Sequence, residues 1–267
     1  MTTRPMTHAL PMLCVWLVAC AGCQSQMNLA TQQEEYTITS TSKEVALGRK
    51  IARQVHVELP SVADDAVQQR VRAIGERIVA VCDRKELVYT FEVIEDPEMN
   101  AFSLPGGYVF VNRGLIDRAA NDDELAAVIA HEVAHVTARH AVKRYESGLG
   151  MQLAQLAAVA ARQGAAASGL GVGMRAAQLA YARQDELEAD RLGVKYMKAA
   201  GFDPRGMLSF LKKLHEHTRQ RNTAYLPRGV VRPQYALTHP YIPDRLRAVK
   251  ETLYGVADYI DYLNAPN

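Results

Sequence analysis

The sequence predicts an α+β fold that is mostly helical and carries one small β-sheet. Aromatic residues make up only 7% of the 267 residues and alanine is abundant, a composition that favours helices. Much of the chain after residue 40 carries apolar residues at helical spacing. Residues 87–112 are instead rich in β-branched and aromatic residues, which is typical of strands.

The N-terminus has the pattern of a lipoprotein signal peptide, predicted at residues 1–19. Its apolar stretch is too short to span a bilayer as a mature helix. The sequence LVAC, which ends at Cys20, resembles a bacterial lipobox, so Cys20 is the predicted lipidation site and Cys23 the alternative. No Asp follows either Cys, and resemblance to bacterial lipoproteins then implies the periplasmic side of the outer membrane. A cleaved leader and a soluble periplasmic protein are the alternative.

Residues 20–40 are polar and without a helical period, and we expect them to form a tether to a domain at residues 41–267. Hydrophobic residues make up 48% of the chain, which is enough for a core. The net charge of +2 is nearly balanced and indicates no nucleic-acid partner. Cys23 and Cys82 are too few for a disulfide framework, and whether they pair stays open.

Helices are predicted before and after the β segment. Thr41 and Glu44 have the pattern of a capping box, which opens a helix to about residue 58. Asn121 or its neighbour caps a long helix that continues to about Tyr145. The Gly- and Ala-rich residues 147–175 predict a helix and a loop, with a gating segment as the alternative. The other predicted elements are helices at about 62–83, 175–199, 204–217 and 243–255, a strand at 87–95, and a hairpin of 100–104 and 108–112.

The long central helix carries His131, Glu132 and His135 in the order H-E-x-x-H. Positions i and i+4 lie about 40° apart on a helix, so both imidazoles can face one ion. Glu132 lies about 100° further round and can reach a water on that ion. The pattern predicts one Zn²⁺ in an open site, with Glu132 as the general base. A surface helix with two incidental histidines is the alternative.

A third protein ligand must come from another part of the chain. The segment after His135 lacks the further His of the metzincin pattern, which excludes that class. Residues 184–193, QDELEADRLG, offer Glu186 and Glu188 as ligands, and Asp190 shares a helical face with Glu186. A ligand Glu beside an acid that orients a ligand His is an arrangement common around zinc. Taken alone, this acidic run also fits a solvent-exposed face.

Three stretches resemble the zinc metallopeptidase family that includes the CAAX prenyl protease and bacterial HtpX. They are HEVAHVTARH from His131, the E-x-x-x-D of Glu186 and Asp190, and residues 100–115. The resemblance implies a gluzincin-like metallopeptidase domain with a hairpin beside the H-E-x-x-H helix. It also implies that Glu186 is the third zinc ligand rather than Glu188, with Asp190 beside it. Among family members, the chain is similar to soluble periplasmic lipoproteins of the LoiP and BepA kind.

Thr238-His239-Pro240, followed by Arg245, resembles a His-Pro segment of those members in which the His can approach the zinc. The resemblance makes His239 a candidate switch ligand or oxyanion donor, together with Arg245. A loop His before a helix-opening Pro is the alternative. His140, His215 and His217 are expected to be structural or surface residues.

The hairpin strand that includes Gly107, Tyr108 and Val109 is predicted to pair with an extended peptide substrate. Gly106 and Gly107 would allow a close approach of that peptide; a plain turn is the alternative. The sequence and the resemblance together predict a zinc-dependent endopeptidase that acts on unfolded, misfolded or stalled envelope proteins. An outer-membrane assembly factor or chaperone with minor or latent proteolysis is the alternative, and the oligomeric state stays open.

Overall fold

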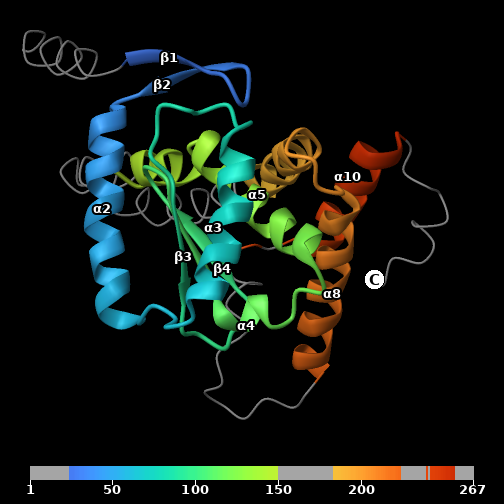
Figure 1. Cartoon of the computed structure of the whole chain (residues 1–267). Helices are drawn as coiled ribbons and strands as arrows, with labels where there is room; N and C mark the ends of the chain where they lie inside the picture. The colour runs from blue at the N-terminus through green and yellow to red at the C-terminus, as the bar shows by residue number, and fades with distance from the viewer. Residues whose placement is uncertain (1–23, 150–182, 224–238, 240, 256–267) are drawn as a thin grey trace, which may run out of the picture.

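The fold is known from a computed structural model that describes residues 24–149, 183–223, 239 and 241–255 (Figure 1). The prediction of a mostly helical α+β fold is confirmed. Within the described part, no helix is both long and apolar enough to cross a membrane. The elements are β1 (Gln24–Asn28), β2 (Gln33–Thr37), α2 (Thr41–Glu58), α3 (Asp65–Val79), β3 (Thr90–Ile94), β4 (Ala101–Leu104), β5 (Tyr108–Asn112), α4 (Arg113–Ile116), α5 (Asp122–Thr137), α8 (Arg205–Thr223) and α10 (Ile242–Tyr254), with further helical residues at 140–149 and 183–199.

The central sheet has three strands in the order β3-β5-β4. β5 runs parallel to β3 and antiparallel to β4, so it is the middle strand. The side chains alternate between two faces, as strand geometry requires. Val93 and Val111 face the main core with α3 and α5, whereas Ile94 and Phe110 pack with Ala52 of α2. In Figure 1, α2 accordingly lies on one side of the sheet and α3 and α5 on the other.

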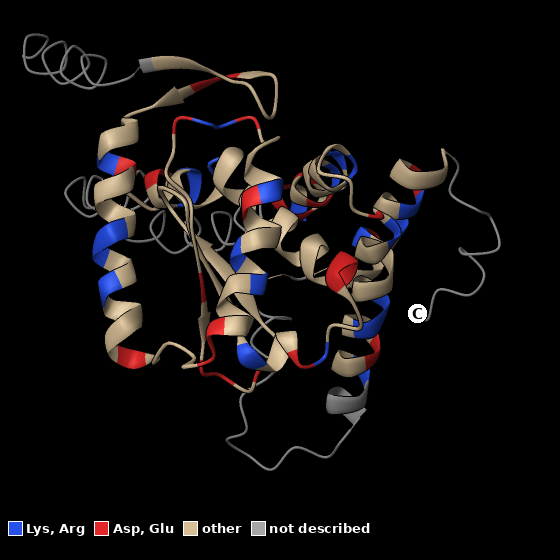
Figure 2. Ribbon diagram, in the orientation of Figure 1, with Lys and Arg blue, Asp and Glu red and all other residues tan. Residues whose placement is uncertain are grey.

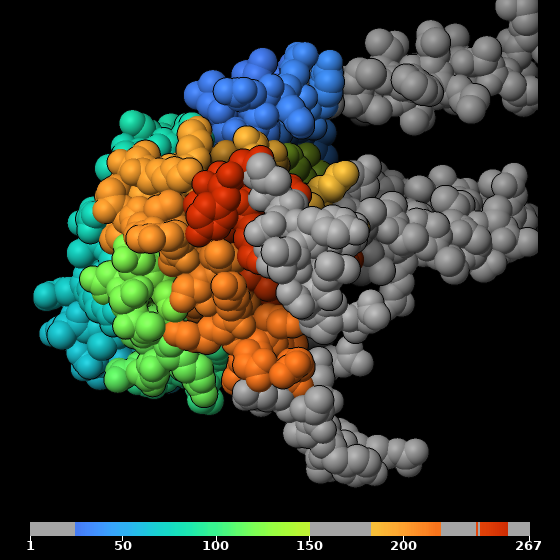
Figure 3. Space-filling view, turned by 90° about the vertical axis from the view of Figure 1, so that its right-hand side faces the viewer, coloured from blue at the N-terminus to red at the C-terminus, as the bar shows by residue number. Residues whose placement is uncertain are grey.

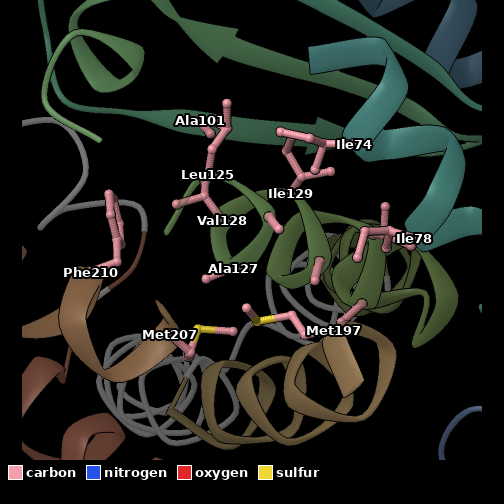
Figure 4. Close-up of a cluster of buried hydrophobic side chains, with 14 of the residues drawn as sticks. Ile74, Ile78, Ala101, Leu125, Ala127, Val128, Ile129, Met197, Met207 and Phe210 are labelled. Carbon is pink, nitrogen blue, oxygen red and sulfur yellow. The ribbon is translucent and has the colours of Figure 1, made fainter. Parts of the chain in front are cut away.

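Helix α5 is the centre of the core, because every residue from Glu124 to Thr137 is buried. It packs against α3, β4 and α8. Figure 4 shows Ile129 of α5 beside Ile74 of α3, with Met197 and Met207 on the opposite side of the helix. A helix that is apolar on all sides is expected to be enclosed by protein. This enclosure explains why apolar residues surround the H-E-x-x-H pattern.

The helices α8 and α10 lie side by side on the outer face of the molecule (Figure 3). α10 ends at Tyr254 and is capped by Gly255, which has a φ of +78° and whose N–H binds the Glu251 carbonyl, so the predicted end of this helix near residue 255 is confirmed. Basic and acidic residues are interspersed along several of the described helices, such as α2 and α8 (Figure 2). This arrangement fits the balanced charge of the sequence.

The predicted capping box at the start of α2 is not formed. Ser40 is the N-cap residue, and its hydroxyl accepts a hydrogen bond from the Lys43 N–H. The carboxylate of Glu44 turns inward instead, to Arg84 at 2.9 Å and to Arg139 at 3.2 Å. Buried guanidinium groups need a carboxylate partner, and this requirement outweighs a local cap.

The segment that we expected to be an irregular tether contains the antiparallel hairpin β1–β2. Glu146 holds the end of this hairpin, because its carboxylate accepts hydrogen bonds from the Thr37 hydroxyl at 2.7 Å and the Thr39 N–H at 2.9 Å. Arg139 donates to the Thr39 carbonyl at 2.6 Å. The strands are short and polar, so their alternation of side chains predicts little. The contacts that hold the hairpin come from residues a hundred or more positions away.

The long helix that we predicted to reach Tyr145 is interrupted. α5 ends at Thr137, and Arg139 has a φ of +59°, the left-handed conformation. A second helical segment then begins at His140. The first part of the chain with the predicted lipidation sites, and most of the Gly- and Ala-rich segment, lie outside the described residues.

Candidate metal centre

Two helices bring the predicted metal ligands together. α5 carries His131 and His135, and the helical residues 183–199 carry Glu186. The Nε2 atoms of the two histidines are 3.0 Å apart. The Glu186 carboxylate lies 3.4 Å from each of them, through Oε2 to His131 and through Oε1 to His135. All three side chains are buried, so their donor atoms converge inside the protein.

His239 lies in the same cluster. Its Nδ1 is 3.1 Å from Glu186 Oε2 and 3.3 Å from His131 Nε2. Its Nε2 faces Glu132 Oε1 at 3.4 Å. One candidate ligand atom from each of His131, His135, Glu186 and His239 lies within 4.8 Å of the others. The cluster therefore offers three imidazoles and one carboxylate, a donor set that suits zinc and related divalent metals.

Asp190 and Arg245 hold the other side of His131. Asp190 Oδ1 is 2.8 Å from His131 Nδ1, so the ring has a fixed orientation. Arg245 of α10 donates to both oxygens of Asp190 at 2.7 Å, and its Nη1 lies 3.1 Å from Glu186 Oε2. The guanidinium is fully buried and links the two carboxylates. Asp190 thus lies between His131 and Arg245 and contacts both.

The other candidate histidine ligand, His135, contacts a further histidine through its Nδ1 atom. Its Nδ1 is 2.7 Å from His140 Nδ1. His140 Nε2 lies 3.2 Å from Glu188 Oε2 and 3.6 Å from Asp185 Oδ1. Glu186 therefore faces His131 and His135, the two candidate histidine ligands, whereas Glu188 faces His140. The expectation that His140 is structural or superficial missed this contact, because α5 was predicted to continue through it.

Glu132 is buried beside the cluster and contacts β4. Its Oε2 accepts a hydrogen bond of 2.9 Å from the Ser103 hydroxyl. Sequence reasoning did not single out Ser103; its only signal was its position in the stretch of residues 100–115 that resembles the family. From the neighbouring strand β4, Ser103 can orient the Glu132 carboxylate and leave its second oxygen for other contacts.

Ionisation in the cluster follows from burial and from neighbouring charges. Burial would raise the pKa of Glu186, but His239 and Arg245 outweigh it and hold that pKa well below the ordinary value. Burial lowers the pKa of His135. Burial and Arg245 also lower the pKa of His131, but Asp190 and Glu186 outweigh them and raise it to about 9. Glu186 is therefore an ionised ligand candidate, and a metal at His131 would replace a proton.

The prediction that Gly107, Tyr108 and Val109 form a substrate-binding edge is wrong. β5 is paired on both sides, so its main-chain groups are already used. The glycines of the turn serve packing within the chain, because a Cβ on Gly106 would lie 2.6 Å from Val45 Cα. Among the described strands β4 pairs with β5 alone, so the free edge beside α5 belongs to β4.

Comparison with known proteins identifies the class to which this fold and site belong. The family model of Peptidase family M48 matches residues 65–253. This range contains every residue of the cluster described above. The chain therefore belongs to peptidase family M48, a family of metallopeptidases that implies a catalytic metal.

Several curated relatives are similar over most of this chain. The beta-barrel assembly-enhancing protease of Yersinia pestis is 31% identical over 242 residues, which are 85% of this chain and 48% of the relative. The protein of the same name from Escherichia coli (strain K12) is 31% identical over 78% of this chain and 43% of its own length. The mitochondrial metalloendopeptidase OMA1 of Schizosaccharomyces pombe is 32% identical over 68% of this chain and 52% of its own length. The chain thus spans about half the length of the curated relatives it matches.

Proposed function

We propose that the chain is a zinc-dependent endopeptidase of the bacterial cell envelope. In this proposal His131, His135 and Glu186 hold one Zn²⁺, and Glu132 is the general base. The observation that carries the proposal is the convergence of two imidazole nitrogens and one carboxylate from separate helices, with Glu132 buried beside them. Each candidate histidine ligand also has a polar partner on its second nitrogen, as metal-bound histidines usually do.

A bound zinc would supply a Lewis acid that polarises the peptide carbonyl and lowers the pKa of a water. Glu132 accepts a proton from the attacking water and passes it to the amide nitrogen that leaves. Ser103 holds Glu132 Oε2 at 2.9 Å, so Oε1 is the oxygen available for this proton. Asp190 and Arg245 keep His131 and Glu186 in place, and the two hydrogen bonds between Arg245 and Asp190 favour this role for Arg245 over that of an oxyanion donor.

The free edge of β4 is the surface that we propose for peptide binding. An extended substrate that pairs with this edge would lie beside Ser103, whose hydroxyl contacts Glu132. Main-chain pairing demands little of the substrate side chains, which suits a protease for unfolded polypeptides. This surface replaces the β5 residues expected from the sequence.

His239 is proposed to restrain the site. Its Nδ1 lies among the candidate ligand atoms, and its Nε2 is 3.4 Å from Glu132 Oε1. A fourth protein ligand would occupy a position that an open catalytic zinc site reserves for water. The other role, an oxyanion hydrogen bond in the transition state, would require His239 to act during the reaction. Replacement with Ala distinguishes the two, because it raises cleavage in the first case and lowers it in the second.

We further propose that the substrates are unfolded, misassembled or stalled envelope proteins. Two of the relatives are named beta-barrel assembly-enhancing protease, which supports an envelope substrate. The lipobox-like sequence supports lipid anchoring through Cys20, or Cys23, on the periplasmic side of the outer membrane. A second candidate function is an assembly factor or chaperone with minor proteolysis, and the presence of His239 in the cluster favours it.

The Glu132→Gln variant tests the proposed function. The purified protein and the variant are incubated with an unfolded β-barrel protein, and metal content is measured for both. The variant should retain metal and lose cleavage. Cleavage at the wild-type rate would refute the role of Glu132, whereas lost cleavage with intact support of envelope assembly in cells would favour the second function.

A further inference from the structure

We propose that His140 is a positioning residue that fixes the ring of His135 through a chain of hydrogen bonds that begins at the buried His135 ring and ends at Glu188. The inference rests on the proposed function, because it takes His135 to be a metal ligand. The inference concerns the contact between His135 and His140, which is separate from the contact between His131 and Asp190. Here the group that faces the ligand ring is itself a histidine, and the carboxylates lie behind it.

The geometry defines one path. His135 Nδ1 and His140 Nδ1 are 2.7 Å apart, which is a hydrogen-bond distance between ring nitrogens. The opposite nitrogen of His140, Nε2, is 3.2 Å from Glu188 Oε2. His140 has no solvent exposure. Both of its nitrogens are therefore turned toward protein partners, one toward the ligand ring and one toward the acidic helix.

Hydrogen-bond chemistry assigns the tautomers along this path. A metal bound at His135 Nε2 requires the proton of that neutral ring to be on Nδ1, so His135 donates to His140. His140 then accepts at Nδ1 and carries its own proton on Nε2, from which it donates to the Glu188 carboxylate. Every donor in the chain has an acceptor. Only one tautomer and one ring orientation of His135 satisfy this arrangement, and that orientation directs Nε2 toward Glu186.

The break between α5 and the next helix makes the contact possible. In an uninterrupted helix, residues i and i+5 point about 140° apart, so His140 could not face His135. Arg139, with its φ of +59°, turns the chain between them. The Arg139 side chain is held by Glu44 at 3.2 Å and by the Thr39 carbonyl at 2.6 Å. This otherwise unfavourable conformation is thus maintained by buried contacts, and its consequence is the His135–His140 pair.

A purely structural role for His140 makes a different prediction. Thr137 provides the comparison, because it is equally buried and its hydroxyl lies 3.0 Å from the Tyr196 hydroxyl, away from the metal ligands. Loss of either buried hydrogen bond would lower stability. Only loss of the His140 acceptor would also change how tightly the site holds a metal.

The test measures Zn²⁺ affinity of the full chain by competition with a chromophoric chelator, for the wild type, His140→Leu, His140→Asn and Thr137→Val. His140→Leu should bind Zn²⁺ about 10- to 100-fold more weakly, the range found when partners of metal-bound histidines are replaced. His140→Asn retains an oxygen at the position of Nδ1 and should recover most of the affinity. Thr137→Val should bind as the wild type does, even where its melting temperature falls. Circular dichroism of each metal-free variant establishes that it is folded.

Two results would overturn the inference. One is equal Zn²⁺ affinity of folded His140→Leu and the wild type. The other is equal weakening by His140→Leu and His140→Asn, which would indicate a packing role without need of an acceptor. Failure of the proposed function looks different, because the wild type itself would then bind no Zn²⁺ or would cleave as fast after Glu132→Gln.

Discussion

Replacement of Glu44 by Gln tests how helix α2 is joined to the rest of the described fold. Glu44 is 1% exposed and lies between two guanidinium groups. It is 2.9 Å from Arg84 and 3.2 Å from Arg139, and its Oε1 accepts from the Gly106 N–H at 3.3 Å. The substitution keeps the shape of the side chain and removes only its charge. Two buried cations would then lack their shared carboxylate.

The magnitude follows from the burial of this cluster. Removing one partner of a buried ion pair costs about 3–5 kcal/mol, because the remaining charge stays in a poorly solvating interior. Both arginine side chains are buried here, at 6% and 4% exposed, so this range applies. For a domain of about 200 residues, such a loss lowers the melting temperature by roughly 6–20 °C.

Glu86 provides a matched control, because it pairs with the same Arg84. Its carboxylate lies 2.8 Å from Arg84 Nε, but its side chain is 51% exposed. An exposed ion pair contributes about 0–1 kcal/mol, so Glu86→Gln should change stability little. Urea unfolding followed by circular dichroism measures both variants. If Glu44→Gln lowers the free energy of unfolding no more than Glu86→Gln does, the buried cluster of Glu44 with Arg84 and Arg139 does not stabilise the fold.

Four further outcomes are expected. Glu132→Gln should lower kcat by about 10²- to 10⁴-fold without loss of metal, measured by peptide cleavage and metal analysis. His239→Ala should raise cleavage, and a decrease would assign His239 to catalysis. Chelation should abolish cleavage and lower the melting temperature, and an unchanged melting curve would refute a role of the metal in the fold. Burial would raise the pKa of Glu124, but bonds from the Ala120 N–H, Lys213 and Ser209 lower it. Ionised Glu124 therefore stabilises the fold at pH values above its unfolded pKa of about 4.3, and this contribution is lost as the pH falls through its folded pKa. The free energy of unfolding of Glu124→Gln should accordingly depend less on pH in the acid range.

Local patterns in the sequence were sufficient to predict the helix that carries His131, Glu132 and His135. The i, i+4 spacing of His131 and His135 is a property of one helix, and an apolar environment was visible in the adjacent residues. The prediction of Glu186 as the third ligand needed more than local patterns, because helical periodicity alone did not distinguish Glu186 from Glu188. The family resemblance chose Glu186, and the fold has Glu186 facing both histidines.

Features that depend on distant contacts could not be read from local patterns. The parallel pairing of β3 with β5 cannot be recognised in the sequence of either strand. Because of this pairing β5 is the middle strand, and the free edge belongs to β4 rather than to β5 as predicted. The inward turn of Glu44 depends on Arg84 and on Arg139, which lie far along the chain. The left-handed Arg139 is stabilised by these same contacts, so the contact of His140 with His135 was hidden as well. These wrong predictions share one cause: each depends on a buried charged residue or a strand whose partner is distant in sequence.

The charge of the cluster explains why an arginine lies so close to a proposed metal site. Glu132, Glu186 and Asp190 are all buried, and Arg245 is the buried cation that contacts two of them. With neutral imidazoles, three carboxylates and one guanidinium leave a formal charge of −2, which a divalent ion would neutralise. Without a metal, Arg245 offsets one of the three negative charges, and a proton on His131, whose pKa is raised to about 9, offsets another. A divalent metal without Arg245 would leave one negative charge unbalanced. The guanidinium would therefore complement a bound metal rather than compete with it, because its donors bind Asp190 and one oxygen of Glu186 while both candidate histidine ligands still face the Glu186 carboxylate.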